Sequence, residues 1–358
     1  MWDFHLCDVQ TGARLMRVKP SGGSWARRWG EKAGGRHSFH LSAPEHAGQN
    51  LWALCDPTKT ALVVSWDMAP VYAGIIQTTS YDTFTNTMDV THEDLWGVFE
   101  HRFMLDKTVS RAPASKMGYA NWSSQTLVKK IVQVATTGNG DPLFSLPIIL
   151  PADVAGTWDA EYLGHQFQPA SEAIQDVMDA ANGPMVDFRP VYDGGLLKWE
   201  LKVQLTESTS FSFNPMFPDS GVKALSLTRT ASEKATHIHV TGNGSEEKIL
   251  WAKATVAGAN TPAREVLVNV SHLKTQARVN SRAAGLAKVR GKTTHQVSMT
   301  IDGTKHVSPS DLKLGSTVSF YTIGSEVWSD GWHDRIVIGY TGDMSGDIVL
   351  ELQELAVE

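Results

Sequence analysis

The hydrophobic and polar positions between Val71 and Phe103 predict two strands followed by a short helix. Val71 to Tyr81 is rich in apolar residues and has the pattern of an extended strand, and the polar residues from Asp82 to Asn86 form a turn-like break. Apolar and polar residues then alternate from Met88 to Thr91, which is the period of a second strand. The apolar positions from Leu95 onward have helical spacing, and two acidic residues precede them, where the helix dipole favours negative charge. We therefore expect a compact β-β-α unit.

Short strands and turns are expected through the rest of the first hundred residues. Leu51 to Cys55 and Ala61 to Trp66 are apolar runs bounded by proline-containing turns. Glycine-rich segments flank a cluster from Trp25 to Trp29, whose sequence is WARRW. These features predict a small, mostly antiparallel β domain that ends in the helix around Trp96.

The composition changes between residues 104 and 170, where proline, glycine, serine and asparagine are frequent. Ser124 is the expected N-cap of a helix from Gln125 to Thr136, because the apolar positions of that segment form one stripe. The segment from Asn139 to Gln168 is expected to be an ordered excursion over the surface, since Leu146 to Leu150 is too apolar to lie in water.

A second helix and a hairpin are expected next. Ser171 is a good N-cap for a helix that continues to Ala181, and an Asn-Gly-Pro sequence follows it as a stop signal. Met185 to Tyr192 and Leu196 to Leu205 predict a hairpin around Asp193-Gly194-Gly195. Together they predict a helix packed on a two- or three-stranded sheet, inserted as an α+β unit.

The last third of the chain returns to β structure. Three strands are expected first, followed by a helix from Ser271 to about Arg290 that Gly291 closes. Four further strands with glycine turns between them suit a small barrel. The seven expected strands are Lys223–Thr230, Thr236–Gly242, Ile249–Val256, Thr293–Ile301, Ser316–Ile323, Trp332–Thr341 and Asp347–Leu355.

The composition of the chain limits the classes of function that the protein can have. The 358 residues are enough for two or three domains with cores of their own. The sequence has no long apolar run, and it does not begin with basic residues followed by an apolar segment. We therefore expect neither a membrane helix nor a signal peptide. Cys7 and Cys55 are expected to be reduced thiols in a cytoplasmic setting. The net charge of −6 argues against sequence-specific nucleic-acid binding, which needs a basic face.

The motifs that carry enzyme chemistry are incomplete, so we expect no enzyme, no cofactor and no metal. Arg290-Gly291-Lys292-Thr293 resembles the end of a P-loop but follows a predicted helix and lacks the upstream glycine. His237 and His239 share one strand face, as metal ligands sometimes do, but no third ligand is indicated nearby. His92-Glu93-Asp94 combines acid and base types, and helix-start acidity explains it.

Aromatic residues are the strongest candidates for recognition, because the chain has 12 tryptophans. The clusters Trp25 to Trp29 and Trp328 to Trp332 place aromatic rings beside charged residues, an arrangement that stacks on sugars or anchors an interface. The alternative is that these rings plug the ends of barrels. The candidate interface or recognition residues are Trp25, Arg27, Arg28, Trp29, Trp96, Arg102, Trp328 and Trp332.

Four segments together resemble the tail-tip or baseplate hub proteins of long-tailed bacteriophages, in particular the minor tail proteins of siphophages that infect actinobacteria. The same hub family occurs in contractile-phage baseplates. The segments are AGIIQTTSYDTFTNTMDVTHEDLWGVFEHR, ASEAIQDVMDAANGPMVDFRPVYDGGLLKWEL, LTRTASEKATHIHVTGNG and the C-terminal run from DLKLGSTVSFY to RIVIGYTGD. The resemblance is one of pattern and order and extends over nearly the whole chain.

The resemblance implies a mainly β fold with two small β-barrel hub domains, residues 1–110 and 219–358, the second including the helix at 271–290. Residues 111–218 would hold the α+β insertion of helix and hairpin. It further implies a homotrimer whose six barrels dock on the sixfold ring of distal tail or tail tube protein. Partners would include the tape-measure protein and other tail-tip proteins, and the trimer would surround the path of DNA ejection. The protein would be assembled in the host cytoplasm and located at the tail tip of the virion.

Two other function classes stay open from the sequence. One is a tail-tip adhesin that binds host cell-wall glycan through the tryptophan loops. The other is a cell-wall hydrolase, which would need carboxylates that converge from distant segments.

Overall fold

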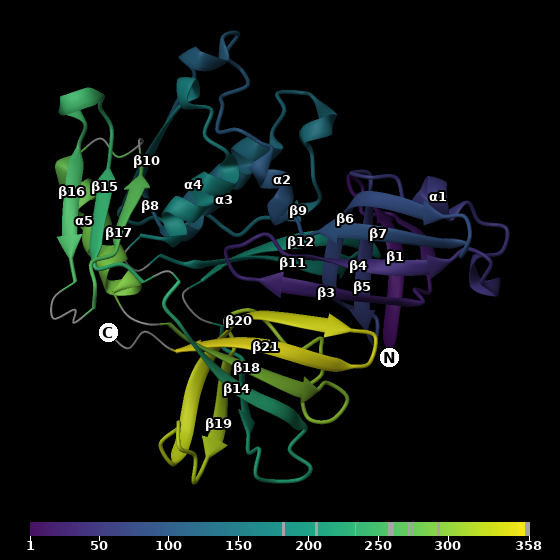
Figure 1. The fold of residues 1–358 in the computed structure, drawn as a ribbon. Helices are drawn as coiled ribbons and strands as arrows, with labels where there is room; N and C mark the ends of the chain where they lie inside the picture. Colours follow the sequence, from purple (N-terminus) through teal and green to yellow (C-terminus); the bar gives the residue numbers. More distant parts are fainter. Residues whose placement is uncertain are drawn as a thin grey trace.

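A computed structural model describes residues 1–180, 183–204, 207–232, 234–256, 261–270, 273, 275–291 and 294–354. The fold is mainly β, with an α+β part in the middle of the chain (Figure 1). None of the helices within these ranges is both long and apolar enough to cross a membrane.

The first hundred residues form an antiparallel β unit with two short helices. The predicted β-β-α unit is confirmed as β6, β7 and α2. Leu51 to Cys55, predicted as a strand, is instead the helix α1, and the Asn50 side chain accepts a hydrogen bond from the Ala53 amide at its start. The elements are β1 (Trp2–Asp8), β2 (Arg14–Val18), β3 (Gly22–Arg28), β4 (Gly34–His40), α1 (Leu51–Leu54), β5 (Thr60–Trp66), β6 (Ala69–Asp82), β7 (Thr87–Glu93) and α2 (Trp96–Glu100).

The centre of this sheet is buried on both faces. Alternate residues of β5 enter two different cores: Leu62 and Val64 face the core between the β units, whereas Ala61 and Val63 face the α+β part. All four are fully buried. A strand covered on both sides has a nearly continuous apolar sequence, as in TALVVSW.

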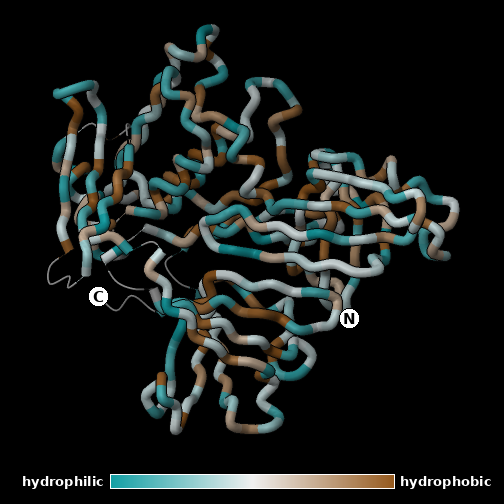
Figure 2. Tube along the Cα trace, in the orientation of Figure 1, coloured by the Kyte–Doolittle hydropathy of each residue, from teal (hydrophilic) through white to brown (hydrophobic). Residues whose placement is uncertain are grey.

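The α+β part covers one face of the first β unit. Its predicted hairpin is confirmed as β11 and β12, and Ile148 and Ile149 add a third, parallel strand to β12. Figure 2 shows hydrophobic residues gathered along α3, α4 and the strands beside them. The elements are β8 (Lys116–Trp122), α3 (Ser124–Thr136), β9 (Ile148–Ile149), β10 (Trp158–Leu163), α4 (Ala170–Met178), β11 (Met185–Asp193) and β12 (Leu196–Gln204).

Both predicted helix starts in this part are displaced toward the N-terminus, that of α3 by one residue and that of α4 by two. Ser123, not Ser124, is the N-cap of α3, and its side chain accepts a hydrogen bond from the Thr126 amide. The N-cap of α4 is Pro169 in an extended conformation, two residues before the expected cap Ser171, and the helix begins at Ala170. The predicted end at Ala181 lies outside the described residues.

A second β unit and a small separate unit make up the rest. The predicted strands over 236–242 and 249–256 form their own sheet with β17, which the sequence did not predict, and α5 covers that sheet. Thr275 caps α5; the predicted start at Ser271 lies outside the described residues. The elements are β13 (Ser210–Phe213), β14 (Val222–Thr230), β15 (His237–Thr241), β16 (Trp251–Thr255), β17 (Glu265–Asn269), α5 (Gln276–Arg290), β18 (Thr294–Asp302), β19 (Thr317–Thr322), β20 (Gly331–Asp343) and β21 (Asp347–Glu354).

The two β units share one sheet, so the two predicted closed barrels are not confirmed. Among the described strands a single 13-stranded sheet runs in the order β14-β18-β21-β20-β3-β4-β7-β6-β5-β1-β2, with β19 on β20 and β13 on β19. The link is the antiparallel pairing of β3 with the end of β20, which lie side by side in Figure 1. Trp25 can lie over this link because a Cβ at Gly342 would be only 2.3 Å from its ring.

Candidate functional site: a buried polar junction

Arg27 is buried because of its place in β3. Trp25 and Arg27 are two residues apart and so share one face of the strand. That face is covered, leaving Trp25 1% and Arg27 6% exposed, whereas Arg28 points the other way and is exposed. Burying a guanidinium is costly unless it is paired and hydrogen-bonded, so the surroundings of Arg27 must supply partners.

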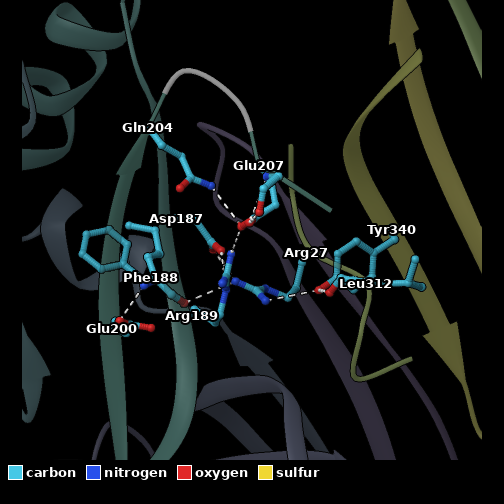
Figure 3. A network of polar contacts seen from close by, with 11 residues as sticks. Arg27, Asp187, Phe188, Arg189, Glu200, Gln204, Glu207, Leu312 and Tyr340 are labelled. Carbon is cyan, nitrogen blue, oxygen red and sulfur yellow. Dashed lines mark hydrogen bonds and ion pairs between the residues drawn. The ribbon is translucent and has the colours of Figure 1, made fainter. Parts of the chain in front are cut away.

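Four charged side chains of alternating sign meet there; we call Arg27, Asp187, Arg189 and Glu207 the polar junction (Figure 3). The Arg27 guanidinium pairs with the Asp187 carboxylate and donates to the Tyr340 hydroxyl at 3.2 Å. Arg189 Nε lies 3.6 Å from the second oxygen of Asp187, and its Nη2 donates to Glu207 at 2.9 Å. Each charge therefore has an opposite charge beside it.

Charge pairing compensates for burial at the polar junction. The four side chains are between 8% and 16% exposed. Burial alone raises the pKa of Glu207, but hydrogen bonds from Arg189 and Gln204 outweigh it and lower that pKa to about 2. Burial opposes the charge of Arg27, and the Asp187 carboxylate nevertheless raises the pKa of Arg27 above its ordinary value. Both groups stay ionised at neutral pH.

The polar junction ties three parts of the chain together. Arg27 belongs to the first β unit, Asp187 to the α+β part and Tyr340 to the second β unit. On the exposed side of β3, Arg28 adds a 2.7 Å ion pair with Glu351 of β21. The cavity beside the junction is only about 20 Å³, room for about one water. This geometry suits a structural clamp rather than a ligand site.

A second buried polar chain crosses the first β unit. The Tyr72 hydroxyl lies 2.8 Å from Nδ1 of His92, and Nε2 of His92 lies 2.8 Å from Nδ1 of His37. Burial lowers the pKa of His37 to about 4 and that of His92 to about 3, so both rings are neutral at pH 7. Nε2 of His37 has no hydrogen-bond partner among the described residues.

Four residues of the predicted Trp25 to Trp29 recognition cluster, Trp25 to Arg28, belong to the strand β3 and not to a loop. The ring of Trp25 contacts Trp2, Tyr72 and Tyr340 in the core, so it is not available to a ligand at the surface. Trp29 is half-buried against the same core. Of the five residues, Arg28 is the most accessible charge, and Glu351 already pairs with it.

Trp96 and Arg102 join the first β unit to the α+β part. Trp96 is 7% exposed and packs edge-on against Phe188 of β11. Arg102 donates to the Ala135 carbonyl at the end of α3 and to the carbonyl of Phe144. Within one chain, both residues therefore make internal contacts.

The second tryptophan pair is divided between core and surface. Trp328 is half-buried, packed edge-on against Phe320 with Arg335 over its ring. Trp332 is 56% exposed and contacts Tyr321 at 5.4 Å between ring centroids. Of the eight candidates, Trp332 is the aromatic side chain that offers a surface.

The histidine pair on β15 does not belong to a metal-binding group among the described residues. His239 lies beside Glu265 and stacks on Trp251, and no group of three or more potential metal ligands occurs in the part of the chain that the structure describes. Lys292 and Thr293 of the P-loop-like segment lie outside the described residues.

Sequence reasoning missed the acidic partners of the junction. Asp187 and Arg189 alternate with buried residues of β11, which is a signal for charges at the edge of a core. Glu207 and Tyr340 are distant in sequence from Arg27, and no local pattern indicates their approach.

No family model matches the sequence, and no curated protein matches it. Solved structures do match the fold. The 43 kDa tail protein of prophage MuSo2 from Shewanella oneidensis has a TM-score of 0.57 at 12% identity, covering 98% of both chains. The tail protein from Neisseria meningitidis MC58 has a TM-score of 0.58 at 12% identity, covering 98% of this chain and 96% of the other.

A third structure, the prophage tail protein gp18 from Listeria monocytogenes EGD-e, has a TM-score of 0.52 at 10% identity over 99% of this chain and 95% of the other. The chain has the fold of phage tail proteins. The resemblance expected from the sequence is thereby confirmed at the level of this phage tail fold. The siphophage type and the domain boundaries stay predictions.

Proposed function

We propose that this protein is a structural, non-enzymatic hub of a phage tail. Three copies would close into a ring at the distal end of the tail tube, with each chain contributing two barrel-like β units. Six such units can satisfy six equivalent sites of a tail tube or distal tail ring, which resolves the mismatch between threefold and sixfold symmetry. The phage tail fold over nearly the entire chain is the observation that carries this proposal.

The internal structure supports a structural role in an assembly. One sheet and one core run through both β units, and the polar junction fixes the α+β part to them. A body joined in this way transmits force without hinging at the boundary between its β units. The partners would be the tail tube ring, the tape-measure protein and other tail-tip proteins, around the path of DNA.

Antibody labelling of intact virions, viewed by electron microscopy, tests the location. We expect label confined to the tail tip, in a number compatible with three copies per particle, after assembly in the host cytoplasm. Unlabelled tips, or label on side fibres, would overturn the hub proposal.

The exposed Trp332 supplies a second test of ring formation. Light scattering of the purified protein should give about three times the 39.1 kDa chain mass, and a larger mass when the tube protein is added. We assign Trp332 as a hot spot of the ring interface, and truncating an aromatic hot spot costs about 2 kcal/mol or more, so Trp332→Ser should weaken this association at least about tenfold. Trp251→Ser is the matched control, because Trp251 is 49% exposed on the separate small sheet.

A further inference from the structure

A large cleft lies between the α+β part and the small unit of β15, β16, β17 and α5. Its volume is about 960 Å³, within the range of small-molecule sites. One wall comes from β8, β10 and α4, and the other from α5 together with Val270, Leu273 and Thr275. The two walls belong to separate hydrophobic cores, so a ligand here would touch two packing units at once.

Ion pairs connect the two walls of the cleft at its sides. Arg282 of α5 pairs with Asp179 at 2.6 Å and also donates to the backbone carbonyl of that residue. Arg278, one turn earlier, lies 3.8 Å from Asp159 of β10. These contacts fix the distance between the walls while leaving the space between them open.

The cleft offers donors and acceptors of both signs beside aromatic and aliphatic surface. Its charged lining residues nearly balance, which disfavours a polyanion such as nucleic acid. Nε of Arg282 is buried and has no hydrogen-bond partner among the described residues, so it can donate to a ligand. Burial raises the pKa of Asp176 to about 7, so near neutrality its carboxyl is present in both donor and acceptor forms.

Tyr119 and Trp158 bring partly exposed rings to the cleft, and Leu273 adds aliphatic surface. Aromatic rings stack on the apolar faces of sugars, and mixed donors and acceptors match hydroxyl groups, which do both. An acetamido group needs a donor, an acceptor and an apolar place for its methyl.

We propose that this cleft is a binding site for an oligosaccharide of N-acetylated amino sugars. The site is distinct from the Trp25 and Trp328 clusters, and it does not depend on the hub role proposed above. Binding would bridge the small unit and the α+β part.

Two glycines make the site testable without disturbing its charges. Gly118 of β8 and Gly285 of α5 line the cleft, and a Cβ at either would meet no atom within 4 Å. Leucine at either position therefore projects into the cleft without an internal clash. Gly22 of β3 is the matched control, because a Cβ there also meets no atom within 4 Å and it does not line the cleft.

The experiment is calorimetric titration of the full chain with N,N′,N″-triacetylchitotriose, and with maltotriose as the sugar without acetamido groups. We expect the first to bind and the second to bind at least about tenfold more weakly. Gly118→Leu and Gly285→Leu should each lower the affinity by at least about tenfold, whereas Gly22→Leu should leave it unchanged. Circular dichroism confirms that each variant is folded.

Absence of binding by the wild type at millimolar sugar would overturn the proposal. Equal affinity of the wild type and both cleft variants would overturn it as well, and equal affinity for maltotriose would remove the acetamido assignment. Because the titration measures sugar binding and the hub tests measure location and association, failure of one leaves the other proposal standing.

Discussion

The guanidinium of Arg27 donates a 3.2 Å hydrogen bond to the hydroxyl of Tyr340, which lies 313 residues later in the chain. Arg27 also pairs with Asp187, so one buried cation contacts the second β unit and the α+β part together. The stability of all three parts is therefore coupled through a single side chain.

Removing this cation should cost far more than removing its neighbour. Arg27→Met leaves the buried carboxylate of Asp187 without its guanidinium, and we expect the free energy of unfolding to fall by about 3–5 kcal/mol. Arg28→Met is the matched control: Arg28 is 46% exposed, and losing its pair with Glu351 should cost about 0–1 kcal/mol. Urea denaturation measures both.

A double variant separates pairing from burial. Arg27→Met combined with Asp187→Leu removes both charges, so its loss should be smaller than the sum of the two single losses. Equal losses for Arg27→Met and Arg28→Met would contradict the role of the junction.

The histidine pair should make the protein sensitive to acid. His37 and His92 take up protons near pH 4 and 3 when folded, whereas an unfolded histidine does so near 6.5. The unfolded state thus binds more protons between these values, and the free energy of unfolding falls as the pH drops from about 6.5 towards 4. Urea denaturation at pH 7 and pH 5 should show a smaller fall for the double variant His37→Gln/His92→Gln. An equal fall in both proteins would show that other groups carry the effect.

Titration of Asp94 should change the stability of the protein in the opposite direction to titration of the two histidines. Burial raises the pKa of Asp94 to about 7, against the effect of hydrogen bonds from the amides of Ala33 and Trp96 and of the charge on Arg27. The folded state then binds the proton more tightly, so stability falls as the pH rises from about 4 to about 7. Asp94→Asn lacks this titration and should gain stability relative to the wild type over that interval. Denaturation at pH 4.5 and pH 8 tests it, and a constant difference would refute it.

Close strand packing predicts that substitution of two different glycines by alanine will change the stability of the protein by different amounts. A Cβ at Gly35 would lie 2.1 Å from the carbonyl oxygen of Ser24 and 2.7 Å from the ring of His92. We expect Gly35→Ala to destabilise by about 1–3 kcal/mol or more, because the obstacle is backbone. Gly22→Ala, with open space around its Cβ, should stay within about 1 kcal/mol of the wild type. Equal melting temperatures of the two variants would contradict this packing.

The sequence predicted elements wherever one pattern dominated. Val71 to Phe103 and the hairpin around Gly194 have clear periods and turn residues, and both formed as expected. Leu51 to Cys55 was mistaken for a strand because a short apolar run has no period that separates strand from helix. The strands from Trp2 to His40 were not delimited, since glycines and charged residues interrupt their alternation.

The local sequence patterns did not predict contacts between residues that are distant in the chain. The segment WARRW was interpreted as a loop because glycines flank it, and only its pairing with β20 shows why Arg27 is buried. Asp187 lies 160 residues from Arg27, so no spacing rule links them. The cleft likewise joins walls from segments that are distant in sequence.

The pairing of β3 with β20 also affects when the nascent chain can complete its folding. Residues 339–343 complete the ladder of β3, so one edge of that strand stays uncovered until almost the entire chain has left the ribosome. An uncovered strand edge pairs readily with other chains, and long-range pairing folds slowly. A chain cut short by premature termination would keep this edge open and aggregate. The β3 edge is therefore covered only in a chain that extends to residue 343.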